Sequence, residues 1–166
     1  MASEPNFTGP EWGLLRDLPY EVILAAIVVD GERKGWQVDK EMSVAAQQLA
    51  ADAKDALDNP IILRVVTEMS QGGTDSGSRK VDLKDERART SAVGSALAAS
   101  VAAAALLKRV PADQAQAYKQ WVVNAAVAVA RAVKSGGVLG IGDQEISNDE
   151  NAFLDRLDAS LELNGE

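Results

Sequence analysis

Apolar residues recur along most of this chain at intervals of three and four, the spacing that places them on one face of an α-helix. Such stripes run from Met42 to Leu57, from Tyr118 to Val133 and from Phe153 to Leu161. No stretch shows the alternation of polar and β-branched residues that is typical of a half-buried strand. The pattern therefore predicts an all-α fold, a helical bundle of about seven helices.

Two prolines near the start of the chain predict where the first helices begin. Proline is favoured in the first turn of a helix, where its missing N–H leaves no hydrogen bond unmade. Pro10 and Pro19 therefore predict two short helices that meet near Leu18. The second of them should end at Asp30–Gly31, because glycine commonly follows the last turn of a helix.

Cap residues place the next two helices and the connection that follows them. Asp39 is the predicted N-cap of a helix that runs to Leu57. Asn59–Pro60 opens a short, largely buried helix, which Gly72–Gly73 ends. The stretch from Ser70 to Lys80 is rich in Gly and Ser and has no apolar period, so it predicts a flexible connection between two halves of the chain.

The second half contains the longest predicted helices. One runs from about Asp82 to Lys108, and Pro111 opens the next, which ends at Ser135. We expect these two helices to form an antiparallel hairpin. Ser147 and Glu150 form a capping box that marks the last helix. Each half thus reads as helix, loop, helix, and both loops close with an acidic residue near the start of the following helix.

One segment of the second half has the length of a membrane span. Thr90 to Leu107 contains eighteen residues without a charge, but most of them are Ala and Ser rather than the large aliphatic residues that favour insertion. We therefore expect a buried helix and no membrane span. Neither end of the sequence shows a signal peptide or lipidation motif, so the expected location is the cytoplasm.

Composition limits the chemistry. The 166 residues fit a single domain, and the net charge of -8 argues against a nucleic-acid partner, which needs clustered Lys and Arg. The chain has no Cys and no His, which excludes thiol and Ser-His-Asp catalysis as well as zinc sites. Any bound metal should therefore be an oxygen-liking cation, calcium or magnesium. No pair of acid and base residues stands at a useful spacing, so we expect no enzyme.

The loop DGERKGWQVDKE, residues 30–41, has part of the spacing of a calcium-binding EF-hand loop. Asp30, Glu32 and Glu41 stand at ligand positions 1, 3 and 12, but Lys34 places a cation where a ligand is needed. We therefore favour a helix-connecting turn whose acidic residues face water. Trp36 lies in this polar stretch, where it could fold back on the bundle or serve as an exposed anchor for a partner.

The segments AAIVVDGERKGWQVDKE and GIGDQEISNDE resemble the TerB-like group of tellurite-resistance proteins. The resemblance implies that the two loops gather acidic residues able to bind a divalent cation. The matching positions are Asp30 and Glu41 in the first loop, and Asp143 and Glu150 in the second. The second loop departs from the pattern, because it has GIGD where an alanine and an Asp-Gly pair are expected.

Two functional classes follow from these observations. The first is a non-catalytic, TerB-like binding module whose acidic loops bind a divalent cation or a cationic protein partner. The second is a structural homo-oligomer, in which the Ala-rich face from Ala92 to Ala105 packs against a second copy.

Overall fold

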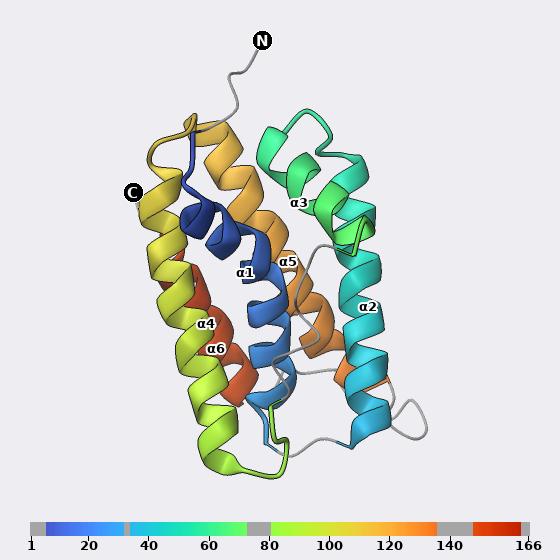
Figure 1. Ribbon diagram of the computed structural model, residues 1–166. Coiled ribbons are helices and arrows are strands. Elements are labelled where there is room, and N and C mark those ends of the chain that lie inside the picture. Colours follow the sequence, from blue (N-terminus) through green and yellow to red (C-terminus); the bar gives the residue numbers. More distant parts are fainter. Residues whose placement is uncertain (1–5, 32–33, 73–80, 136–147, 164–166) are drawn as a thin grey trace.

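The computed structural model describes residues 6–31, 34–72, 81–135 and 148–163, and these contain six helices and no strand. The all-α prediction is confirmed, with six helices in place of about seven (Figure 1). Their bounds are α1 Gly9–Val28, α2 Gly35–Lys54, α3 Pro60–Ser70, α4 Glu86–Leu107, α5 Ala112–Ser135 and α6 Asn148–Ser160.

Helix α5 runs through the middle of the bundle, with α2 packed along one side of it and α1 along another. Helix α4 packs against α1, and α6 lies beside both α4 and α5 (Figure 1). The expected hairpin of α4 and α5 is wrong, because the principal neighbour of α4 is α1 and that of α5 is α2. The two halves of the chain therefore interleave, and one hydrophobic core draws on all six helices.

Helix α1 is continuous through Pro19, which corrects the prediction of two short helices that meet near Leu18. Proline has no N–H, so the carbonyl of Leu15, four residues earlier, loses its usual helical partner. The hydroxyl of Tyr118 on α5 donates a hydrogen bond to that carbonyl. Both residues are fully buried, so a distant side chain replaces the missing backbone donor and the helix goes on.

A second aromatic residue of α5 donates a hydrogen bond to the backbone of α2. The indole nitrogen of Trp121 donates to the carbonyl oxygen of Leu49 on α2, at 3.0 Å. The rings of Tyr118 and Trp121 are neighbours, with centroids 6.1 Å apart and a tilt of 51°. One aromatic pair thus joins α5 to the backbones of both α1 and α2, and buries a large apolar area in doing so.

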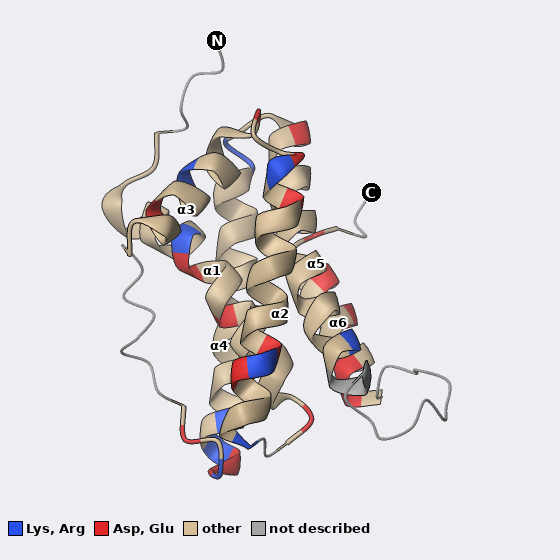
Figure 2. Cartoon of the chain, turned by 90° about the vertical axis from the view of Figure 1, so that its right-hand side faces the viewer, with Lys and Arg blue, Asp and Glu red and all other residues tan. Residues whose placement is uncertain are grey.

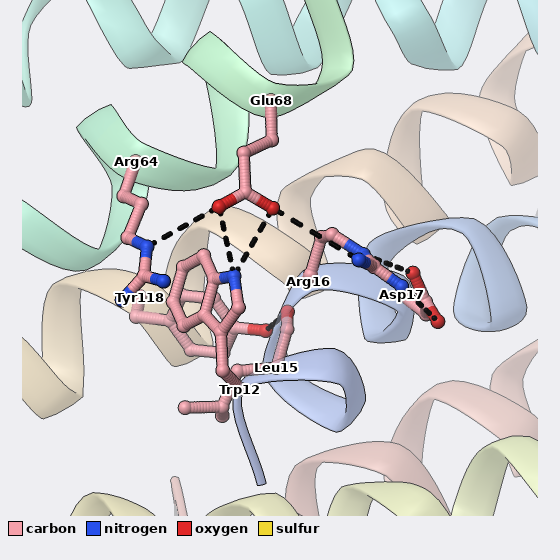
Figure 3. A network of polar contacts seen from close by, with 7 residues as sticks. All are labelled: Trp12, Leu15, Arg16, Asp17, Arg64, Glu68 and Tyr118. Carbon is pink, nitrogen blue, oxygen red and sulfur yellow. Dashed lines mark hydrogen bonds and ion pairs between the residues drawn. The ribbon is translucent and has the colours of Figure 1, made fainter. Parts of the chain in front are cut away.

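Helix α3 is held by polar contacts at its two ends. The Asn59 side chain accepts from the backbone N–H of Ile61 at 3.0 Å, as an N-cap, and its amide donates to the carbonyl of Gln114 on α5 at 2.9 Å. Towards the other end, both carboxylate oxygens of Glu68 accept from the indole N–H of Trp12, at 3.0 and 3.1 Å (Figure 3).

Arg64 completes this contact between α1 and α3. Its guanidinium lies over the Trp12 ring, 4.0 Å from the centroid, while its Nε is 3.2 Å from a carboxylate oxygen of Glu68. A cation on the ring face and a carboxylate on the ring edge match the charge distribution of an indole. Trp12 is buried, and no local pattern in the sequence marks its two charged partners.

The predicted apolar faces are confirmed for α5 and only in part for α2. The α5 stripe of Tyr118, Val122, Ala125, Ala126 and Val129 is buried, and Val133 lies outside the side chains that the structure describes. On α2, Ala45, Leu49 and Ala53 are buried, but Ala46 is exposed and Leu57 is 57% exposed. Leu57 faces water because α2 ends at Lys54, three residues earlier than predicted.

Helix α4 is less buried than the sequence predicted. Among the described residues it is the one helix long and apolar enough to cross a membrane by length and composition, and 33% of its most apolar window is buried within the chain. One side of it packs on α1 through Ala96, Ala103 and Leu107. The opposite side, which includes Val101 at 57% exposure, faces solvent.

We predict that the hydroxyl of Tyr118 stabilises the fold because Pro19 is present. Tyr118→Phe leaves the buried Leu15 carbonyl without its donor, which should lower the free energy of unfolding by about 1–3 kcal/mol. Pro19→Ala supplies a backbone N–H to the same carbonyl, so Tyr118→Phe should cost about 1 kcal/mol less in that background. Urea denaturation of the two single variants and the double variant measures this coupling. An equal cost in both backgrounds would contradict the assignment.

Burial, reinforced by the negative charge of Asp17, raises the pKa of Tyr118 above its ordinary value of 10.0. Above pH 10 the unfolded chain loses this proton while the folded chain keeps it, so stability should fall by about 1.4 kcal/mol per pH unit from this group. Denaturant titrations at pH 9 to 11 should show this loss of stability in the wild type and a smaller loss in Tyr118→Phe.

The variant Tyr20→Phe leaves Tyr118 as the single tyrosine. In this variant the phenolate absorbance should rise together with unfolding as the pH increases. A rise while the chain is still folded would disprove the assignment.

Candidate functional site

The structure places three of the five predicted metal ligands, and Glu32 and Asp143 lie outside the described residues. Asp30 follows the last turn of α1 and is half-buried, Glu41 is on the second turn of α2, and Glu150 is on the first turn of α6. Glu41 is 3% exposed and Glu150 is 2% exposed. Among the described residues they are the only two carboxylates that are buried.

The burial of Glu41 corrects the expectation that the acidic residues of the first loop face water. Removing an ionised carboxylate from water costs several kcal/mol, and proteins keep such groups where a cation or several hydrogen bonds compensate. A turn that only connects two helices would not require this burial. Glu41 is thus a buried carboxylate with interactions inside the folded chain, not a solvent-facing residue of the turn.

The first loop is shorter than the sequence predicted. Helix α2 begins at Gly35, four residues before the predicted cap at Asp39. The Gln37 side chain explains the early start, because its oxygen accepts a hydrogen bond from the Lys34 backbone N–H at 2.9 Å. Gly35–Glu41 is therefore helical, whereas an EF-hand loop wraps these positions around the ion.

Trp36 lies in the first turn of α2 and is 63% exposed. It does not fold back onto the bundle, so of the two sequence-based alternatives the exposed position is the observed one. The other two indoles are buried, Trp12 at 7% and Trp121 at 3% exposure. Trp36 is thus the one tryptophan whose ring a partner can reach.

A cavity of about 400 Å³ lies where α1 ends and α4 and α6 lie alongside. Val28 and Val93 contribute its apolar walls, and the charged residues of its lining are Asp30, Glu86, Arg89, Asp149 and Arg156. Residues of both charge signs occur at this end of the bundle, where α2 and α4 begin (Figure 2). The cavity can therefore make charge-assisted hydrogen bonds to ions of either sign.

The charged residues of this cavity do not form a closed metal site. The described residues contain no group of three or more Asp or Glu side chains placed to hold a metal ion. Arg89 is partly committed elsewhere, because its guanidinium donates to the carbonyl of Leu83 at 2.6 Å. A complete metal site would therefore also need ligands from Glu32 and Asp143, the two predicted ligands outside the described residues.

Sequence reasoning identified Asp30 but not its neighbours in this cavity. Glu86, Arg89 and Arg156 come from helices that meet Asp30 through tertiary packing, and no local motif marks them. Asp149 had a signal, since it stands next to Glu150 in the SNDE capping sequence.

Comparisons of the chain with known protein families, with curated proteins and with solved structures gave no match.

Proposed function

We propose that this chain is a non-catalytic, TerB-like binding module that takes a divalent cation at its two inter-helix loops. One observation carries the proposal. The two carboxylates that the TerB-like resemblance assigns to the closing positions of the loops, Glu41 and Glu150, are also the two that are buried among the described residues. Exposed acidic residues are common in a chain of net charge -8, but buried ones are not.

The chemistry of the chain restricts the cation. Without His and Cys the ligands are oxygens, which suit calcium or magnesium. Asp30, Glu41 and Glu150 would supply carboxylate oxygens, together with Glu32 and Asp143 of the same two loops. A cation bound there would bind the folded chain and not the unfolded one, so it should stabilise the fold. The same acidic loops could instead receive a cationic side chain of a protein partner.

Calcium and magnesium should raise the melting temperature through Glu41 and Glu150. At an ion concentration of 100 times Kd the stabilisation is about 2.7 kcal/mol. Glu41→Gln and Glu150→Gln keep the shape of the side chain and remove its charge, so each should reduce or abolish the shift. Thermal melts and calorimetric titration with each ion measure both effects.

Asp155→Asn is the matched control, because Asp155 is an exposed acidic residue on the same helix as Glu150. This variant should respond to the ions like the wild type. A wild type that neither binds nor shifts at millimolar calcium or magnesium would refute the cation proposal. If both Gln variants show the same rise in melting temperature as the wild type, any bound ion lies elsewhere.

The exposed face of α4 supports a second candidate, a structural homo-oligomer. Between Arg89 and Lys108 the chain has no charged residue, and the outward positions include Gly94, Ala98 and Val101. Small side chains allow the backbones of two helices to approach closely, and an uncharged surface avoids repulsion between two acidic copies. We propose for this candidate a contact between two α4 helices.

If this face forms the contact, light scattering should give a mass above that of the 17.5 kDa chain. Val101→Glu places a charge at the centre of the face and should return the protein to a monomer. Leu63→Glu, at a 44% exposed apolar position on α3, is the control and should leave the mass unchanged. A monomeric wild type at all concentrations rules the oligomer out.

A further inference from the structure

A groove lies between α2 and α5. It has a volume of about 480 Å³, within the range of small-molecule sites. Its apolar lining comes from Val44 on α2 and from Val127 and Ala128 on α5. We call it the α2–α5 groove, and its polar lining residues are Gln48, Asn124 and Arg131.

Helices α2 and α5 run in opposite directions, so Gln48 on α2 and Asn124 on α5 lie at the same end of the groove (Figure 1). At one end both amides are engaged with Asp52. Gln48 donates to one of its carboxylate oxygens at 2.8 Å, and Asn124 donates to the other at 3.2 Å. This end is therefore closed by a satisfied polar cluster with an acidic centre, which would repel an anion.

The other end carries Arg131. It lies one turn beyond Val127 on α5, is exposed, and makes no ion pair with any residue that the structure describes. A guanidinium offers a fork of N–H donors that fits a carboxylate through two parallel hydrogen bonds. The groove thus has apolar side chains in its middle, a cation at one end, and at the other end two amides that are bound to Asp52.

We propose that the α2–α5 groove binds a small amphiphile with a carboxylate head and a short apolar tail, such as a medium-chain fatty acid. The carboxylate pairs with Arg131, and the tail lies over Val44, Val127 and Ala128. The polar cluster around Asp52 limits the length of the tail. The groove shares no residue with the proposed cation site, although Val44 lies one turn after Glu41 on α2.

Octanoate is the probe, titrated calorimetrically into the full chain. Arg131→Gln removes the charge and should weaken octanoate binding about tenfold or more. Ala128→Leu fills the groove with a larger side chain and should also weaken binding, while circular dichroism shows an intact fold. Arg87→Gln, at an exposed arginine at the start of α4, is the matched control and should bind octanoate like the wild type.

Octanol separates the head from the tail. It should bind more weakly than octanoate, and its binding should be indifferent to Arg131→Gln. The absence of octanoate binding at millimolar concentration would overturn the proposal. Equal octanoate affinity of the wild type and Arg131→Gln would also overturn it. An equal loss of octanoate affinity in Arg131→Gln and Arg87→Gln would do the same.

Discussion

The hydrogen bond from the Tyr118 hydroxyl to the Leu15 carbonyl is the contact on which the arrangement of the bundle depends. Pro19 removes the N–H that would normally pair with this carbonyl, and a buried carbonyl without a donor is costly. By supplying the donor from α5, the fold keeps α1 as one helix and fixes it against the centre of the bundle. Trp121, one turn further along α5, joins α5 to α2 through an added hydrogen bond to the Leu49 carbonyl.

This central pairing positions the candidate site at one end of the bundle. Because α1 and α2 are both held against α5, the end of α1 and the start of α2 are placed together with their acidic residues, Asp30 and Glu41. The packing of α4 on α1 and of α6 on α4 then adds Glu86, Asp149 and Glu150 to the same end. Charged groups gather there while the core above them is made mostly of small and aliphatic residues.

The sequence correctly predicted the features that depend on local periodicity. Its predictions were wrong where a residue distant in the sequence determines the local structure. The all-α class and the buried face of α5 follow from apolar spacing, and both are confirmed. Pro19 was taken for a helix start because the rule for first-turn prolines is local, whereas its compensating donor is 103 residues away from Leu15. The extra helix in the predicted count follows from that single misplacement. The hairpin of α4 and α5 failed for a related reason, since connectivity does not determine which helix faces which.

For the candidate site, the residues could be named from the sequence but their environment could not. The resemblance selected Glu41 and Glu150, and capping rules placed Glu150 near a helix start. Their burial comes from tertiary packing, and the rule that acidic residues of loops face water predicted the opposite for Glu41. Trp36 shows the converse, an aromatic residue that packing leaves exposed. The contacts of Arg64 and Glu68 with Trp12 could not be predicted from local sequence patterns either, because they join α3 to α1.

The most direct measurement of the central contact is the proton NMR signal of the Tyr118 hydroxyl. A buried hydroxyl that donates to a backbone carbonyl exchanges slowly with water, so its proton should give a resolved resonance, with cross-relaxation to protons of Leu15 and Pro19 on α1. If the signal is missing because of rapid exchange, or if it reports neighbours outside α1, then α1 is not held through Tyr118 and the account of the bundle is wrong.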